Sequence, residues 1–184
     1  MGNVDGKATA ITVVTPVKPG HVLLLRAVFF IGEHVHSLMS RLEQLSFIHY
    51  ARWTIFDELA WNGDPQPKED LRYHYLFFES NFNGTWDEYI DAFAEVVPNR
   101  MRAIWDSSFG FPGPKPIGPF TDYIRRNDLD VGHYYSAYPQ STTTEILSAL
   151  RVTKALDAFT AEAIDDEDFA DRYDELLTQL QNDL

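Results

Sequence analysis

Two stretches rich in aromatic and β-branched residues decide the fold: SFIHYARWTIF at residues 46–56 and LRYHYLFFESNF at residues 71–82. Residues of these types favour β-strands because their side chains pack well on a pleated sheet. Between the two stretches lies WNGDPQP at residues 61–67, whose Asn, Gly, Asp and Pro residues are typical of turns. We therefore predict two antiparallel strands joined by a long loop.

The residues before this hairpin predict one more strand and a helix. Residues 8–14 form a β-branched run that stops at Pro16, which is typical of a strand. Pro19 then opens a segment in which apolar residues recur at helical spacing from Leu24 to Leu45. Proline suits the start of a helix, where its missing N–H would have no partner.

The residues after the hairpin continue with helices. Thr85 and Glu88 match a capping box, in which the two side chains satisfy the first free N–H groups of a helix. Pro98 breaks or kinks this helix, and residues 100–107 add another turn or two. Residues 110–118, GFPGPKPIG, contain too much Gly and Pro for regular structure and form a loop, which would be a lid if it covers a pocket.

The last 60 residues complete the predicted order. Residues 121–126 form a short helix, and VGHYYSAY at residues 131–138 is predicted as the fourth strand. Thr142 and Glu145 cap a further helix, and the residues from Asp165 onward form a last, acidic one. The last helix carries an apolar stripe and is predicted to dock on its own domain or on a partner subunit.

This β-α-β-β-α-β order is that of the split βαβ, or ferredoxin-like, arrangement. The predicted class is α+β, with a four-stranded antiparallel sheet. We predict one ferredoxin-like domain over residues 1–184, with a core at about 8–138 and C-terminal helices at about 142–184.

Composition and charge restrict the function. Of 184 residues, 45% are apolar, so the chain can bury a core; its net charge of −13 argues against nucleic acid, whose phosphates need clustered cations. The absence of cysteine excludes disulfides and thiol chemistry. The most apolar stretch, residues 22–31, is shorter than the roughly 20 residues that cross a membrane. With no signal-peptide pattern at the start, we expect no membrane partner and a cytoplasmic location.

The predicted strands carry more large aromatic residues than two helices can cover: Phe47, Trp53, Tyr73, Tyr75, Phe77 and Phe78. An uncovered aromatic sheet face predicts either a ligand or a second sheet. RNA-recognition modules use such a face to stack on bases. Here the third strand lacks the glycine of their signature and the net charge has the wrong sign, so a ligand or a second sheet is favoured.

In strand order and aromatic loading, residues 8–138 resemble the dimeric α+β barrel superfamily, in which two ferredoxin-like sheets close around a pocket. Its members include antibiotic-biosynthesis monooxygenases, haem-binding chlorite dismutases and dye-decolourising peroxidases. The resemblance implies a homodimer and an oxidoreductase that acts on a small apolar or aromatic molecule, either with haem or without a cofactor. The alternative is a non-catalytic protein that binds a small ligand or uses the barrel only as an interface.

Candidate site residues follow from strand alternation, which sorts polar side chains onto the two sheet faces. His49, Arg52, Glu79 and Asn81 are the candidate catalytic residues. His133 is the candidate haem ligand, and hence metal ligand, with Tyr135 and Trp53 as further cofactor contacts.

Each candidate also has a purely structural interpretation. Either histidine would be a satisfied core or rim residue, and Arg52 would pair with Glu79 across the hairpin. Alternation places His49 and Arg52 on opposite faces unless a bulge intervenes, which weakens the haem model.

Overall fold

The computed structural model describes residues 3–34, 45–161 and 168–183 and divides the chain into two compact units, Met1–Gln140 and Ser141–Leu184. The division falls between the predicted core and the predicted C-terminal helices, and the single domain over residues 1–184 stays a prediction. Each unit is taken by itself below. None of the described helices is both long enough and apolar enough to span a bilayer.

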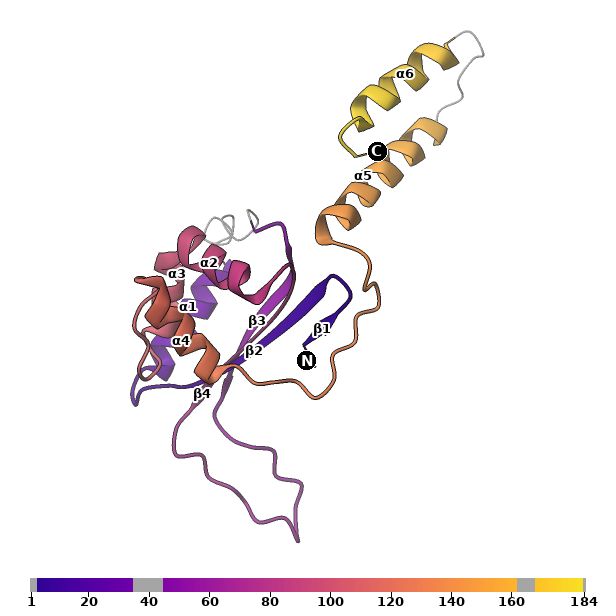
Figure 1. Cartoon of the computed structure of the whole chain (residues 1–184). Helices are drawn as coiled ribbons and strands as arrows, with labels where there is room; N and C mark the ends of the chain where they lie inside the picture. The colour runs from indigo at the N-terminus through magenta and orange to yellow at the C-terminus, as the bar shows by residue number, and fades with distance from the viewer. Residues whose placement is uncertain (1–2, 35–44, 162–167, 184) are drawn as a thin grey trace. The chain divides into compact units, whose positions relative to one another are not determined.

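The first unit contains a four-stranded antiparallel sheet (Figure 1). Its strands are β1 (Val4–Asp5), β2 (Ala8–Pro16), β3 (Ile48–Phe56) and β4 (Tyr75–Asn83), in the order β1-β2-β4-β3. The three long strands are those predicted, and β3 and β4 form the predicted antiparallel pair. Because β4 pairs antiparallel with both β2 and β3, these two strands run parallel to one another with β4 between them.

The predicted strand at residues 131–138 is wrong: these residues form no strand, and the fourth strand is β1. The physical reason is that side-chain oxygens, rather than a neighbouring strand, accept hydrogen bonds from backbone N–H groups of this segment. Asn3 Oδ1 accepts a hydrogen bond from the Val131 N–H at 3.0 Å, and Asp5 Oδ2 accepts one from the Ser136 N–H at 2.9 Å. The edge of β2 near Ala8 is already paired with β1, so no edge is free there for residues 131–138.

Four helices complete the first unit: α1 (Val22–His34), α2 (Trp86–Val96), α3 (Pro98–Trp105) and α4 (Ile117–Asn127). All four contribute to one core with one face of the sheet; its members include Leu25, Phe93, Trp105, Phe120, Ile11, Leu76, Phe78 and Phe82. The capping box of α2 is confirmed, since the Glu88 N–H donates to Thr85 and the Thr85 N–H donates to Glu88. The predicted helix ending at Leu45 is confirmed as far as His34; its continuation at residues 35–44 lies outside the described residues.

The second unit is a helical hairpin of α5 (Thr143–Ala161) and α6 (Phe169–Leu180). The predicted cap of α5 is confirmed: the Thr142 N–H donates to Glu145 Oε2 at 2.7 Å, and the Glu145 N–H donates to Thr142 Oγ1 at 3.2 Å. Leu176 and Leu180 of α6 are buried, and Arg151 of α5 pairs with Asp183 beyond the end of α6.

Asp128 joins α2 to the edge of the sheet. Its carboxylate accepts hydrogen bonds from the Thr12 N–H at 3.2 Å and from the Trp86 indole N–H at 2.9 Å. Burial raises the pKa of Asp128, although both donors act in the opposite direction. This half-buried carboxylate accepts from both donors at once, so its loss leaves the two N–H groups without this acceptor.

We expect Asp128→Ala to lower the free energy of unfolding by about 1–3 kcal/mol, the usual cost of buried polar groups that lose their partner. Chemical denaturation of the full chain measures this. Asp130→Ala is the matched control, because Asp130 is exposed two residues away, and it is expected to change stability by less than about 0.5 kcal/mol. Equal effects of the two substitutions would contradict this role of Asp128.

Candidate functional site

The two faces of the sheet differ in what covers them, and β4 shows the difference most clearly. Leu76, Phe78, Ser80 and Phe82 alternate along the strand and are buried, whereas the side chains between them are half-exposed. The buried set faces the four helices. The helices of the first unit lie together on that side of the sheet (Figure 1). The other side is therefore the accessible one.

We call this accessible side the open face, and it is built by β3 and β4. Its members are Tyr50, Arg52, Thr54 and Phe56 from β3 and Tyr75, Phe77, Glu79 and Asn81 from β4. On β2 the neighbouring Ala10 and Thr12 are buried, whereas Val14 and Pro16, opposite Phe77 and Tyr75, are half-buried, so β2 adds to the accessible part only at that end. Tyr50 and Phe56 of the edge strand β3 remain 43% and 40% exposed, so this face presents aromatic rings to solvent.

Glu79 organises the polar part of the open face. The register places Arg52 directly opposite Glu79, and Arg52 Nε lies 3.0 Å from Glu79 Oε2. The Tyr50 hydroxyl donates a hydrogen bond to the other carboxylate oxygen at 3.2 Å. The Arg52 guanidinium also lies over the Phe77 ring, 5.5 Å from its centroid. The predicted Arg52–Glu79 ion pair is thus present, and it leaves this polar group with no net charge.

Asn81 extends the polar group toward a second tyrosine. Its Nδ2 donates a hydrogen bond to the Tyr134 hydroxyl at 2.8 Å. Tyr134 is half-buried, whereas its neighbours His133 and Tyr135 are exposed. The segment that was predicted as a strand therefore supplies one side chain to the open face instead.

Two tyrosines of the open face, Tyr50 and Tyr134, are harder to ionise than usual. Burial is the main cause that raises the pKa of Tyr50, and the charge and hydrogen bond of Glu79 raise it further. Burial likewise raises the pKa of Tyr134, against the effect of the hydrogen bond from Asn81. Both phenols therefore stay protonated at neutral pH. A protonated phenol can orient a bound molecule by hydrogen bonding but is a poor general base.

His49 does not lie with this group. The pairing of β3 with β4 shifts between Ile48 and Tyr50, so His49 is the extra residue of a β-bulge, and it is exposed. A bulge breaks the strict alternation from which its face was predicted. The structure therefore does not bring His49 together with Arg52, Glu79 and Asn81.

Trp53 lies on the helix-covered side of the sheet, not on the open face. It pairs with Phe78 in the register, and the two ring centroids are 5.1 Å apart. Its indole N–H is buried and has no hydrogen-bond partner. Trp53 is therefore part of the packing under the helices and does not line the same surface as Arg52.

The residues proposed for haem do not fit that group in the single chain. An axial histidine has to direct a ring nitrogen into a sheltered pocket, but His133 is exposed on an irregular segment. Tyr135 is 75% exposed beside it. In the part of the chain that the structure describes, no three His, Cys, Asp or Glu side chains come together as a metal site.

Comparison of the chain with models of known protein families, with curated proteins and with solved structures finds no match. The functional conclusion therefore depends on the geometry of the chain itself.

Sequence reasoning missed Tyr50 and Tyr134 as site residues. The signal for Tyr50 was present, because strand alternation places it on the same face as Arg52. Tyr134 carried no such signal, since its segment has the composition of a strand but lacks the structure of one.

We expect Glu79→Gln to lower the pKa of Tyr50 part of the way toward its usual value. Loss of the negative charge makes the phenolate easier to form, while burial still disfavours it. NMR titration of ring-labelled tyrosine, with Tyr50→Phe to assign the signal, measures the shift. The stability should change by less than about 1 kcal/mol, because the ion pair is largely exposed. An unchanged or higher pKa would show that Glu79 does not control this phenol.

Proposed function

We propose that two copies of the chain pack with their open faces together and hold a small apolar or aromatic molecule between them. The observation that carries the proposal is the open face itself, on which aromatic rings surround a polar group of no net charge. Phe56 and Phe77 contact edge to face, with centroids 5.5 Å apart, and provide an apolar surface beside Arg52 and Glu79. Such a combination is typical of small-molecule sites, where a few polar groups orient a mainly apolar ligand.

The charge distribution supports pairing through this face. The whole chain carries a net charge of −13, which opposes self-association in general. On the open face, however, the charges of Arg52 and Glu79 cancel. Burial of two such faces against one another therefore removes apolar surface from water without bringing like charges together.

The polar groups of the open face indicate the kind of ligand. Tyr50 and Tyr134 are protonated phenols, and each already has a hydrogen-bond partner that fixes its position. An aromatic molecule with a hydroxyl or carbonyl substituent suits these groups, since its ring can lie against Phe77 and its substituent can reach a phenol.

We propose further that the sheet is a ferredoxin-like variant and that the dimer is of the α+β barrel type. Support comes from the adjacency of β2, β4 and β3, with α1 following β2 and α2 following β4 along the chain. The edge beside β2 departs from the expected pattern, because it is occupied by β1 and by a single bridge from Asp128 to Val13.

Oxidation of the bound molecule is a second candidate function, and it is the one that the sequence resemblance implies. The observation in its favour is the Glu79 carboxylate, which both accepts the Tyr50 hydrogen bond and pairs with Arg52. Such a carboxylate can orient a substrate hydroxyl and take up its proton. Binding and assembly remain the first candidate, because the raised pKa values of both phenols suit hydrogen bonding better than proton abstraction.

The oligomeric state tests the pairing. We expect the wild-type chain to sediment as a dimer and Arg52→Glu to sediment as a monomer, because the substitution brings four acidic groups together in the paired faces. Arg126→Glu changes the net charge equally on the exposed surface of α4 and should leave the dimer intact. Analytical ultracentrifugation distinguishes these results. A wild-type monomer at all concentrations, or a dimer that withstands Arg52→Glu, would overturn the pairing.

Ligand binding is tested with 2-naphthol, a fluorescent aromatic alcohol. We expect saturable binding, weakened about threefold to tenfold by Tyr50→Phe, which corresponds to one hydrogen bond of about 0.5–1.5 kcal/mol. Tyr138→Phe is the control, since Tyr138 is 72% exposed and outside the open face. Equal weakening by both substitutions would contradict the proposed site.

The same probe separates the two candidate functions. An oxidase or peroxidase acting at this site consumes oxygen or peroxide when 2-naphthol is added, at a rate that Glu79→Gln lowers at least tenfold, by analogy with the usual contribution of a positioned acid or base. Binding of 2-naphthol without any consumption supports the non-catalytic function.

A further inference from the structure

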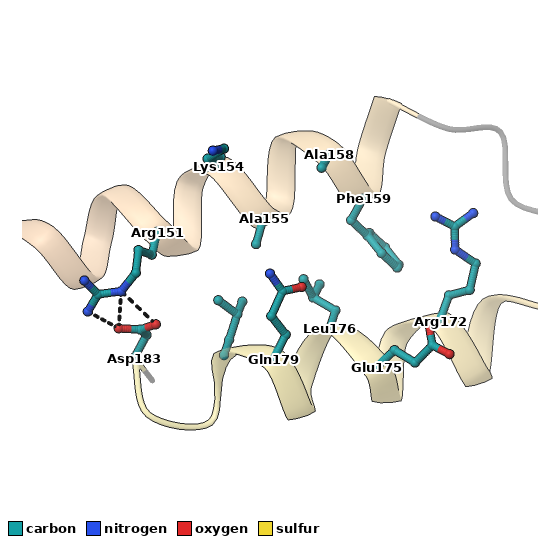
Figure 2. Close-up of a pocket in the computed structure, with 11 residues that line it drawn as sticks. Arg151, Lys154, Ala155, Ala158, Phe159, Arg172, Glu175, Leu176, Gln179 and Asp183 are labelled. Carbon is teal, nitrogen blue, oxygen red and sulfur yellow. Dashed lines mark hydrogen bonds and ion pairs between the residues drawn. The ribbon is translucent and has the colours of Figure 1, made fainter.

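The helical hairpin of the second unit has two different sides. One side holds a shallow groove between α5 and α6 that is lined by charged and polar residues as well as apolar ones (Figure 2). Arg151 and Asp183 close one end of it, where Arg151 Nε donates to Asp183 Oδ1 at 2.9 Å. Lys154, Glu175 and Gln179 also belong to this polar side.

The other side of the hairpin is apolar. We call it the apolar face, and it consists of Val152, Leu156, Phe169, Tyr173 and Leu177. These residues recur at intervals of four along each helix, which places them on one stripe per helix, and none of them lines the groove. Phe159 of α5, which also lines the groove, packs against the α6 stripe: its ring lies 5.8 Å from that of Phe169 and 6.4 Å from that of Tyr173.

This apolar face remains accessible within the hairpin. Leu156 and Tyr173 are each 44% exposed, and Phe169 is 49% exposed. Leu176 and Leu180 are the only apolar side chains that are buried among the described residues of this unit. Two helices with so small a core do not normally form a stable structure in water, so the apolar face requires a further element to cover it.

The net charge of the hairpin indicates what kind of element can cover the apolar face. Residues 141–184 contain 11 Asp and Glu against 3 Lys and Arg, and 3 minus 11 gives a net charge of −8. Asp157 and Asp174 each follow a residue of the apolar face by one position and are exposed on the same two helices. Two hairpins stacked through this face would bring sixteen net negative charges together, by doubling the −8, which disfavours a second copy.

We propose that the apolar face binds a basic amphipathic helix of a partner protein. The partner helix would place apolar residues at intervals of three and four against Leu156, Tyr173 and Leu177, and its Lys or Arg would be attracted by the net negative charge of the hairpin. Recognition of this kind completes a three-helix bundle, with apolar contacts giving affinity and the acidic hairpin selecting a basic partner. The proposal does not depend on pairing of the open face, which uses other residues in the first unit.

The probe is a synthetic 18-residue helical peptide of Leu and Lys whose leucines form a single stripe. We expect the full chain to bind it in isothermal titration calorimetry, and the double variant Leu156→Gln, Leu177→Gln to bind at least tenfold more weakly. Leu150→Gln is the matched control: Leu150 is 62% exposed on α5, outside the apolar face, and binding should stay within twofold. Tyr173→Gln provides an independent variant, and circular dichroism verifies that each variant retains its helices.

Two further peptides complete the test. A peptide of the same composition with the leucines scattered around the helix should bind at least tenfold more weakly, and so should a peptide with Glu in place of each Lys. Equal binding of the striped and scattered peptides would overturn the proposal, because it would show only attraction between opposite charges. No binding of the striped peptide would overturn it as well. Dissociation of a wild-type dimer by Leu156→Gln, Leu177→Gln, but not by Arg52→Glu, would assign the apolar face to a second copy.

Discussion

The hydrogen-bonded position of β4 between β2 and β3 is the constraint on which the rest of the first unit depends. A central strand is paired along both edges, so its side chains must alternate strictly between the two faces of the sheet. In β4 this alternation places Leu76, Phe78 and Phe82 under the helices and leaves Phe77 and Glu79 on the open face. A slip of one residue would exchange these two sets and bury the Glu79 carboxylate, so the apolar core and the open face fix the register together.

The three long strands and the ion pair of the open face could be predicted because each has a local signal. Alternating aromatic and β-branched residues identify β3 and β4, and opposite charges at mid-strand identify Arg52 and Glu79 as cross-strand neighbours. The capping boxes at Thr85 and Thr142 have an equally local signature. In each case the interacting residues are close in sequence or lie on adjacent strands of one hairpin.

The predictions for residues 131–138, His49 and Tyr134 failed because the contacts that decide their structure are distant in sequence or depend on irregular backbone. Residues 131–138 resemble a strand, but their N–H groups are satisfied by Asn3 and Asp5, more than 120 residues away. Side-chain periodicity carries no information about such contacts. The bulge at His49 is likewise invisible to alternation, which assumes regular pairing. Tyr134 lies within residues 131–138, so its place on the open face also depends on contacts that are distant in sequence.

The two units also differ in the partners that their electrostatics allow. On the open face one guanidinium and one carboxylate neutralise each other, so a second copy of the same face is acceptable. The helical hairpin carries more than half of the net negative charge of the chain in fewer than a quarter of its residues, so a basic helix suits its apolar face better. We therefore propose different partners for the two surfaces, a second copy for the open face and a different protein for the apolar face.

The most direct test of the pairing is an isotope-filtered NOE spectrum of a one-to-one mixture of labelled and unlabelled chains, which detects only contacts between copies. We expect intermolecular signals from the ring protons of Tyr50, Phe56 and Phe77, and none from Phe93 or Trp105 in the core beneath the helices. A dimer whose intermolecular signals arise from any other surface, with none from the open face, would contradict the central claim.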